Sequence, residues 1–251
     1  MINFFQAILL GVIQGVAEFF PVSSSGHLVL AQLALGLQEA PFTFDILVHF
    51  ASLLAVIIFF FPQIKKLKLH QLFLIGLANV PVAVVGLLIS NHLELLFGSK
   101  WIVVAGLLIT GLLNLSIHSR LQKQTRPDNL SWSKAGLIGV FQALAIIPGI
   151  SRSGSTLFAS TNSGLSRERA FEFSFLISIP AILGANFLQL FKDQVGFSQL
   201  LSQPSWIAGG LTAFFVSLLS LRLLRQMIKK AQFSLFAYYC FGLALISAFV
   251  I

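Results

Sequence analysis

Charge is scarce in this chain of 251 residues. Lysine, arginine, aspartate and glutamate together make up 10% of it, whereas 57% of its residues are hydrophobic. A soluble domain carries about 25% charged residues, so the composition excludes an ordinary soluble protein. Long apolar runs recur, and the short alternating segments of a lipid-facing barrel do not. The composition therefore predicts an all-α polytopic membrane protein.

Cysteine and acidic residues are scarcer still. The single Cys240 lies in an apolar run, so it cannot form an internal disulfide and lacks metal-ligand spacing. Eight acidic residues stand against sixteen Lys and Arg, a formal net charge of +8. The basic residues lie between hydrophobic runs, as the positive-inside rule expects. We therefore assign the excess charge to membrane orientation and expect no nucleic-acid partner.

Six segments match the length of about 20 apolar residues that a helix needs to cross a bilayer. They are Phe42–Phe61, Leu72–Ser90, Trp101–Ile117, Ala170–Leu190, Ser205–Leu224 and Phe233–Ile251. Three of the connecting loops hold three, four and four basic residues: Pro62–Gln71, Ile117–Lys134 and Arg222–Gln232. The other two loops, Asn91–Lys100 and Lys192–Pro204, hold one each. This asymmetry places the basic loops in the cytoplasm.

Two further segments, about Asn3–Leu37 and Lys134–Leu165, must each enter and leave the membrane on one side. Each is long enough for two half-helices and has a proline-containing break near its middle. We expect re-entrant helical hairpins, the first entering from outside and the second from inside. The chain is then a single integral membrane domain over residues 1–251, with both termini outside.

The two hairpins are related in sequence. "GVIQGVAEFFPVSSSG" (Gly11–Gly26) aligns with "GVFQALAIIPGISRSG" (Gly139–Gly154) at an offset of 128, with seven identical pairs. Each hairpin precedes three of the predicted spans. Two halves of about residues 1–117 and 134–251, in opposite orientations, predict an inverted-topology repeat.

The two breaks are the expected place for chemistry. Irregular backbone at membrane depth is tolerated only inside protein or along a wet cavity, and helix N-termini attract anions. Both "SSSG" and "SRSG" present hydroxyls and backbone N–H groups, which suits phosphate, and Arg152 adds a planar guanidinium. The candidate substrate ligands are Gln14, Ser23, Ser25, Gly26, Ser151, Ser153 and Thr156.

The halves differ in their reactive groups. The first hairpin carries Glu18, Ser24 and His27, and the second has Arg152 at the position of Ser24. A carboxylate and an imidazole beside a guanidinium indicate bond breaking or ion coupling. If Ser24 and His27 share a helix face, His27 could take a proton from Ser24 or give one to a leaving group. Glu18, four residues after Gln14, could hold a divalent cation.

The same residues also have structural interpretations. Glu18 could cap the next half-helix, His27 could be a packing histidine, and Arg152 could only neutralise Glu18. Serines in apolar helices usually bond to the preceding turn. Asp45 and His49, four residues apart at the start of a span, could line the cavity or lie at the membrane interface.

Two motifs resemble a known family. "QGVAEFFPVSSSGH" resembles the acidic segment and Ser-rich turn of bacterial undecaprenyl-diphosphate phosphatases, the bacitracin-resistance family, and "PGISRSGST" is similar to its P-G-x-S-R-S-x-x-T motif. The resemblance implies hydrolysis of undecaprenyl diphosphate to undecaprenyl phosphate and phosphate, which recycles the carrier for cell-wall synthesis. It implies a site on the outer side of the bacterial cytoplasmic membrane and a divalent cation, Mg²⁺ or Ca²⁺.

Carried over by position, the resemblance gives catalytic roles to four residues. Glu18, with Gln14, falls in the acidic motif, and Glu18 is the candidate metal ligand. Ser24 and His27 are the nucleophile and the acid/base in either order, and Arg152 is the phosphate clamp. Gln14 is the neutral alternative in the motif, and Ala51 stands where glycine is expected.

A second function stays open at this point. Inverted repeats and broken helices are equally typical of transporters, so the chain could be a transporter or flippase of a polyprenyl phosphate lipid using the same anion site. His27 together with Glu18 favours the phosphatase, because carrying an anion requires no nucleophile. Membrane lipids are expected partners in either case, and a homo-oligomer is compatible with both.

Overall fold

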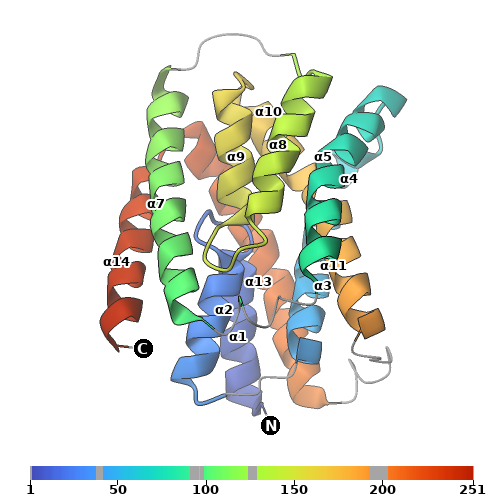
Figure 1. The fold of residues 1–251 in the computed structure, drawn as a ribbon. Helices are drawn as coiled ribbons and strands as arrows, with labels where there is room; N and C mark the ends of the chain where they lie inside the picture. The colour runs from blue at the N-terminus through green and yellow to red at the C-terminus, as the bar shows by residue number, and fades with distance from the viewer. Residues whose placement is uncertain are drawn as a thin grey trace.

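The computed structural model describes residues 2–37, 42–90, 96, 99–123, 129–192 and 203–250, and within them every extended regular element is an α-helix (Figure 1). The helices are α1 (Phe4–Ala17), α2 (Ser24–Ala34), α3 (Phe42–Phe59), α4 (Phe61–Ile64), α5 (Leu69–Ile89), α7 (Lys100–Lys123), α8 (Trp132–Leu144), α9 (Arg152–Asn162), α10 (Arg167–Leu176), α11 (Ser178–Lys192), α13 (Pro204–Lys229) and α14 (Ser234–Val250). The predicted all-α class is confirmed. Of the predicted loops, residues 91–95, 97–98, 124–128 and 193–202 lie outside the described residues, as does residue 251.

All six predicted apolar segments are helical. Helices α5, α7 and α13 and the continuous α10–α11 pair are long and apolar enough to cross a membrane by length and composition, whereas α3 and α14 are shorter apolar helices. Helices α7 and α13 run on to Lys123 and Lys229, beyond the predicted ends at Ile117 and Leu224. Basic side chains carry their charge on a long apolar stem, so a helix can continue through the interface. The apolar helices identify an integral membrane protein.

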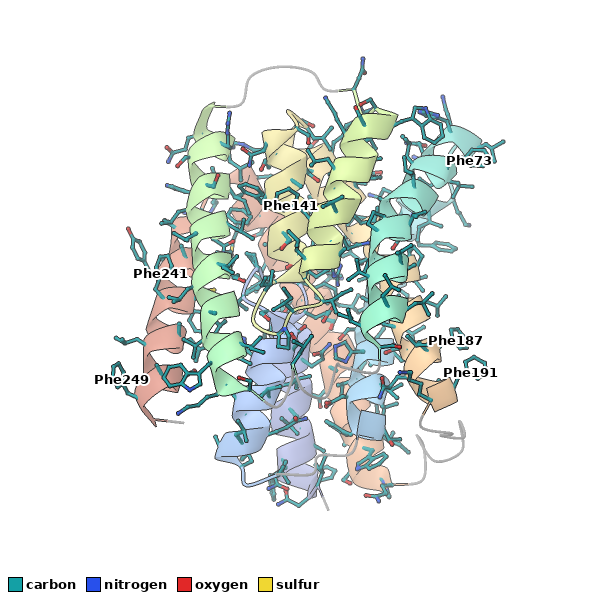
Figure 2. All side chains as sticks on the ribbon, viewed as in Figure 1. Phe73, Phe141, Phe187, Phe191, Phe241 and Phe249 are labelled. Atoms are coloured by element: carbon teal, nitrogen blue, oxygen red, sulfur yellow. The ribbon has the colours of Figure 1, made fainter. Side chains whose placement is uncertain are left out.

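The outer surface of the bundle is apolar. Figure 2 shows Phe73, Phe187, Phe191 and Phe249 at the periphery, and each of these side chains is exposed, Phe249 to 83%. Leucines on α5 and α13 are exposed in the same way. Monomeric soluble proteins rarely expose such contiguous apolar surface, so these helices face lipid.

Two helical hairpins enter the bundle from opposite ends (Figure 1). Helices α1 and α2 pack against each other and rise from the end where the N-terminus lies, and α8 and α9 pack against each other and descend from the other end. Their turns meet near mid-height. The two breaks predicted from the sequence are therefore close in space.

The sequence repeat extends to the helices. Helix α1 begins at Phe4 and α8 at Trp132, and α2 and α9 share both boundaries at the same offset of 128. Helix α1 packs along α13, and α8 packs in the same way along α5. The helix caps also repeat, since Ser23 Oγ accepts from the Gly26 N–H at 3.3 Å and Ser151 Oγ accepts from the Gly154 N–H at 3.1 Å.

A cluster of aromatic rings anchors the first turn. Phe19 lies in the break after α1 and is fully buried. Its ring centroid lies 5.7 Å from that of Phe175 in α10, which stacks on Phe60 at 6.0 Å. Burial of an apolar side chain contributes about 1.5–3 kcal/mol. The break that follows α1, which contains Glu18, is therefore fixed by core packing although it is not helical.

Two glycines that are equivalent in the repeat lie at close helix crossings. A Cβ on Gly11 would meet the backbone of Gly209 in α13, and a Cβ on Gly139 would meet the backbone of Ala78 in α5. Both hairpins therefore depend on a missing side chain where their first helix meets its long neighbour.

We predict that Gly139→Ala lowers the free energy of unfolding by about 1–3 kcal/mol, because overpacking forces α8 away from α5. Gly136, in the same helix, has open space at its Cβ position, so Gly136→Ala should leave stability unchanged or raise it by about 0.5–1 kcal/mol. Thermal unfolding of the purified protein in detergent measures both. Equal melting temperatures for the two variants would contradict the close contact.

Candidate functional site

The two turns contact each other reciprocally. A Cβ on Gly26 would lie 3.3 Å from Gly149 Cα, and a Cβ on Gly154 would lie 3.3 Å from Pro21 Cβ. Each member of the first pair is related to one member of the second by the offset of 128, so the contacts are equivalent under the repeat. Residues 23–27 and 151–155 thus lie together, as the sequence predicts.

Glu18 is the centre of the hydrogen bonding between the turns. Its Oε1 accepts from Arg152 Nη2, and its Oε2 accepts from Ser24 Oγ at 2.7 Å and from Gln14 Nε2 at 3.1 Å. The residue is only 7% exposed, and a buried carboxylate requires such partners. Gln14 lies one helical turn before Glu18 on the same face of α1, as expected. The structure therefore brings together Gln14, Glu18, Ser24 and Arg152.

Two polar atoms beside this ion pair have no hydrogen-bond partner among the described residues. Arg152 Nη1 is a buried donor, and Gln14 Oε1 is a buried acceptor. Buried polar groups are nearly always hydrogen-bonded, so an unpaired donor and an unpaired acceptor indicate a place for a ligand. A phosphate oxygen suits the first atom, and a cation suits the second.

The N-termini of α2 and α9 frame the site. Helix α2 begins at Ser24 and α9 at Arg152, so the N–H groups of their first turns have no carbonyl of their own helix to bond. The hydroxyls of Ser25 and Ser153 lie 3.3 Å and 3.1 Å from those of the cap residues Ser23 and Ser151. These serines therefore stabilise the helix starts, while the backbone N–H groups remain suited to an anion.

The backbone at Ser23 is strained. Its φ is +71°, in a region that residues other than glycine rarely adopt, whereas its counterpart Ser151 has φ −72°. Such outliers cost about 1–3 kcal/mol and cluster at functional sites. The repeat is therefore broken in the hairpin that carries Glu18 and His27.

His27 does not form the expected pair with Ser24. Its Nδ1 lies 2.8 Å from the Ser23 carbonyl oxygen, and its Nε2 lies 2.7 Å from the hydroxyl of Tyr239 in α14. Because a carbonyl only accepts, Nδ1 carries the proton and Nε2 accepts from the tyrosine. The Ser24 hydroxyl instead donates to Glu18, and the His27 ring has no free nitrogen for it, because Nδ1 bonds to the Ser23 carbonyl and Nε2 to Tyr239.

Thr156 was also expected to bind substrate, but its hydroxyl bonds within its own helix. It is fully buried, and its hydroxyl donates to the Arg152 carbonyl at 2.9 Å within α9. This is the ordinary back-bonding of a threonine in an apolar setting. The predicted substrate roles of Ser23, Ser25, Gly26, Ser151 and Ser153 remain predictions, and the backbone N–H groups of Gly26 and Ser151 already have partners within the protein.

Two neighbours of the site were not among the predicted site residues. His49 Nε2 in α3 lies 3.7 Å from Glu18 Oε2, and its spacing from Asp45 gave a weak signal in the sequence. Asp45 itself accepts from Gln32 Nε2 at 2.9 Å. Tyr239 lies in an apolar run, and nothing in the sequence around it indicates a contact with His27.

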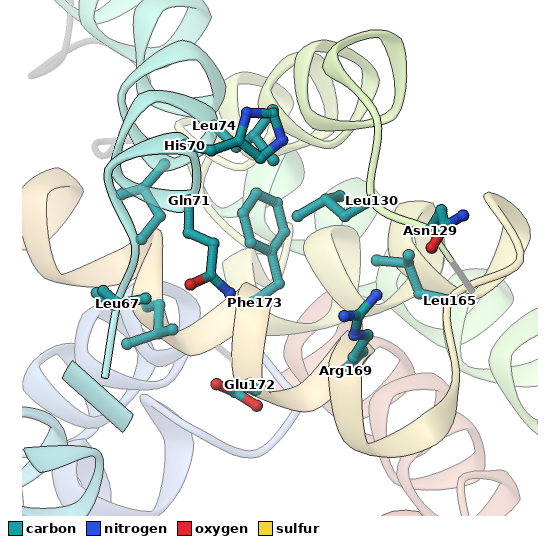
Figure 3. Close-up of a pocket in the computed structure, with 12 residues that line it drawn as sticks. Leu67, His70, Gln71, Leu74, Asn129, Leu130, Leu165, Arg169, Glu172 and Phe173 are labelled. Atoms are coloured by element: carbon teal, nitrogen blue, oxygen red, sulfur yellow. The ribbon is translucent and has the colours of Figure 1, made fainter. Parts of the chain in front are cut away.

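A separate cavity lies near the start of α5 (Figure 3). Its volume is about 370 Å³, and it is lined by twelve residues that include His70, Gln71, Arg169 and Glu172. None of the predicted site residues lines it. The candidate site is therefore the ion pair between the turns rather than this cavity.

The facing helix starts and the buried ion pair lie inside a helical membrane protein, and known proteins are similar to it in sequence over nearly the whole chain. The family model described as "Bacitracin resistance protein BacA" matches residues 7–246. A protein named undecaprenyl-diphosphatase from Desulforapulum autotrophicum is 39% identical, covering 97% of this chain and 96% of the relative. One of the same name from Halothermothrix orenii is 37% identical, covering 94% and 93%. The chain belongs to the BacA family, and the resemblance carried by the two motifs is confirmed.

We predict that Glu18 and Arg152 are energetically coupled. Removing either partner alone, as in Glu18→Gln or Arg152→Met, leaves an uncompensated charge in a buried setting and should cost about 3–5 kcal/mol. In the double variant, the loss in free energy of unfolding should be smaller than the sum of the two single losses by about 0.5–3 kcal/mol. Unfolding of the four proteins in detergent measures this coupling. Strictly additive losses would show that the two side chains act independently.

Proposed function

We propose that this chain hydrolyses undecaprenyl diphosphate to undecaprenyl phosphate and inorganic phosphate, and so recycles the lipid carrier of cell-wall synthesis. Membership of the BacA family supports the proposal, as do the relatives named undecaprenyl-diphosphatase that match nearly all of the chain. The site agrees with this chemistry, because it offers a guanidinium and two helix N-termini to a phosphate at membrane depth.

One observation carries the assignment to an enzyme rather than a transporter. The Ser24 hydroxyl donates to the buried Glu18 carboxylate at 2.7 Å, opposite Arg152. A hydroxyl held against a base is the arrangement of an activated nucleophile. Binding and releasing an anion requires the arginine but not this pair.

The geometry supports a two-step transfer through Ser24. Ser24 Oγ attacks the terminal phosphorus and passes its proton to Glu18, and the bond from that phosphorus to the bridging oxygen breaks. Undecaprenyl phosphate leaves. Water then attacks the phosphoserine, the serine oxygen takes its proton back from Glu18, and inorganic phosphate is released. His27 is the less suitable nucleophile because both of its ring nitrogens already have partners.

Arg152 stabilises the charge that develops during the transfer. Its Nη2 stays on Glu18, and its unpaired Nη1 is available to an equatorial phosphate oxygen. Backbone N–H groups at the starts of α2 and α9 add further donors. Fixed donors aimed at developing charge are usually the largest contribution to such reactions.

We also propose a divalent cation, Mg²⁺ or Ca²⁺, held by Glu18 and Gln14. Gln14 Nε2 contacts the Glu18 carboxylate, and Gln14 Oε1 has no hydrogen-bond partner among the described residues, so this oxygen is available to such an ion. The described residues contain no cluster of three or more His, Cys, Asp or Glu side chains suited to a metal. The donor set therefore suits an ion that takes its other ligands from water and the diphosphate, as Mg²⁺ often does. When bound, the ion would offset the negative charge of the diphosphate.

The membrane arrangement that we propose has six spans and two re-entrant hairpins in an inverted repeat, with the site open to the outer side of the bacterial cytoplasmic membrane. Helix α4, with the basic segment after it, and the facing ends of α7 and α8 lie at one end of the bundle (Figure 1). The first and last described residues lie toward the other end. Under the positive-inside rule the first end is cytoplasmic.

We predict that the purified protein releases phosphate from undecaprenyl diphosphate in detergent, and that Arg152→Lys and Ser24→Ala each lower kcat by about 100-fold or more. Lysine keeps the charge but cannot contact Glu18 and phosphate through two fixed nitrogens. Ser247→Ala is the control, because that buried hydroxyl bonds within α14. Unchanged phosphate release in either site variant would exclude this mechanism.

We predict that a chelator abolishes activity and that added Mg²⁺ or Ca²⁺ restores it. Gln14→Glu should lower the cation concentration for half-maximal activity by about tenfold, because a second carboxylate binds a divalent ion more strongly. A titration of activity against free cation compares the variant with the parent. Full activity in excess chelator would contradict the cation proposal.

A further inference from the structure

A single hydroxyl on α7 holds both sides of the second turn. Thr110 Oγ1 donates to the Gly149 carbonyl at 2.8 Å and accepts from the Ser151 N–H at 2.9 Å. Thr110 is fully buried. Gly149 has φ +88° and packs against Gly106, one helical turn before Thr110. The turn therefore lies directly on α7, where one side chain bonds two of its buried backbone groups, the Gly149 carbonyl and the Ser151 N–H.

The next helical turn of α7 holds the first break. Asn114 Nδ2 donates to the Pro21 carbonyl at 2.6 Å, and Asn114 is also fully buried. Thr110 and Asn114 are four residues apart and share a face of α7. Turn carbonyls at membrane depth have no water to bond, so protein donors must satisfy them.

The repeat offers a second helix for this task, α14, which reaches the first hairpin through Tyr239 and His27 but has only a weak donor at the Pro21 carbonyl. Pro21 and Gly149 are equivalent at the offset of 128, and the residue that reaches Pro21 from α14 is Cys240, with its sulfur 3.9 Å from the carbonyl oxygen. A thiol is a weak donor. The Pro21 and Gly149 carbonyls are thus both held chiefly by hydrogen bonds from α7, which connects the two turns through one helix.

We propose that Thr110 and Asn114 are positioning residues for the reaction, setting the distance between Ser24 with Glu18 on one turn and Arg152 on the other. The proposal rests on the proposed function for its kinetic consequence, but not for the geometry of the turns. The hydrogen bonds described for Thr110 and Asn114 go to the turns rather than to Glu18, Ser24 or Arg152. A displacement of about 1 Å at a reacting centre can cost about 100-fold in rate, so loss of either bond should act on kcat.

The kinetic test compares Thr110→Val with Thr110→Ser. Valine keeps the shape but removes the hydroxyl, and kcat should fall by about 30–100-fold with KM within about threefold. Serine keeps both hydrogen bonds, so the kcat of Thr110→Ser should stay close to that of the parent protein. Asn114→Leu should behave like the valine variant. Thr212→Val is the matched control, because the Thr212 hydroxyl bonds only within α13, to the Ala208 carbonyl at 2.8 Å.

A second measurement does not depend on activity. Amide hydrogen exchange should rise in residues 145–151 of Thr110→Val and in residues 18–23 of Asn114→Leu, with other helices unchanged. The proposal would be overturned if Thr110→Val kept the kcat of the parent protein or if Thr110→Ser lost it. It would also be overturned if hydrogen exchange in the turns were unchanged, or if exchange became faster throughout the chain. If the parent protein shows no phosphate release while the exchange changes are local, the proposed function fails and the positioning of the turns stands.

Discussion

The ion pair between Glu18 and Arg152 is the interaction on which the rest of the site depends. Each charge comes from a different hairpin, and each would be costly at this depth without the other. Pairing them requires two breaks in helices that enter from opposite ends of the bundle. The reciprocal packing of Gly26 on Gly149 and of Gly154 on Pro21 provides that approach, and the serine caps satisfy the helix starts on both sides.

The sequence repeat gives the two hairpins a common backbone, and they differ in the reactive side chains that they carry. The starts of the hairpin helices, their serine caps and the close glycine crossings follow the offset of 128. The reactive groups do not, because Glu18 and His27 have no counterparts of their kind in the second hairpin. Strain follows the same division, since only the first cap residue, Ser23, has a positive φ. Two equivalent turns have thus diverged, with Glu18 and His27 on the first hairpin and Arg152 on the second.

Much of this arrangement could be predicted from the sequence, because apolar length, loop charge and an aligned repeat each depend on few residues. Those patterns gave the helices, the facing turns and the group of Gln14, Glu18, Ser24 and Arg152. Side-chain partners that depend on packing could not be predicted. Tyr239 reaches His27 across 212 positions of sequence, and Thr156 and Thr110 look alike in the sequence although one bonds its own helix and the other a distant turn.

The attachment of both turns to α7 has a mechanical consequence. A carrier that exposes one site alternately to two sides of a membrane rocks one half of its fold against the other. In this structure α7, a helix of the first half, is hydrogen-bonded to the turn of the second hairpin through Thr110 and to the turn of the first hairpin through Asn114. Rocking would have to break buried hydrogen bonds that no water can replace at that depth. Attachment to one helix therefore opposes any movement that would change the separation of the two turns.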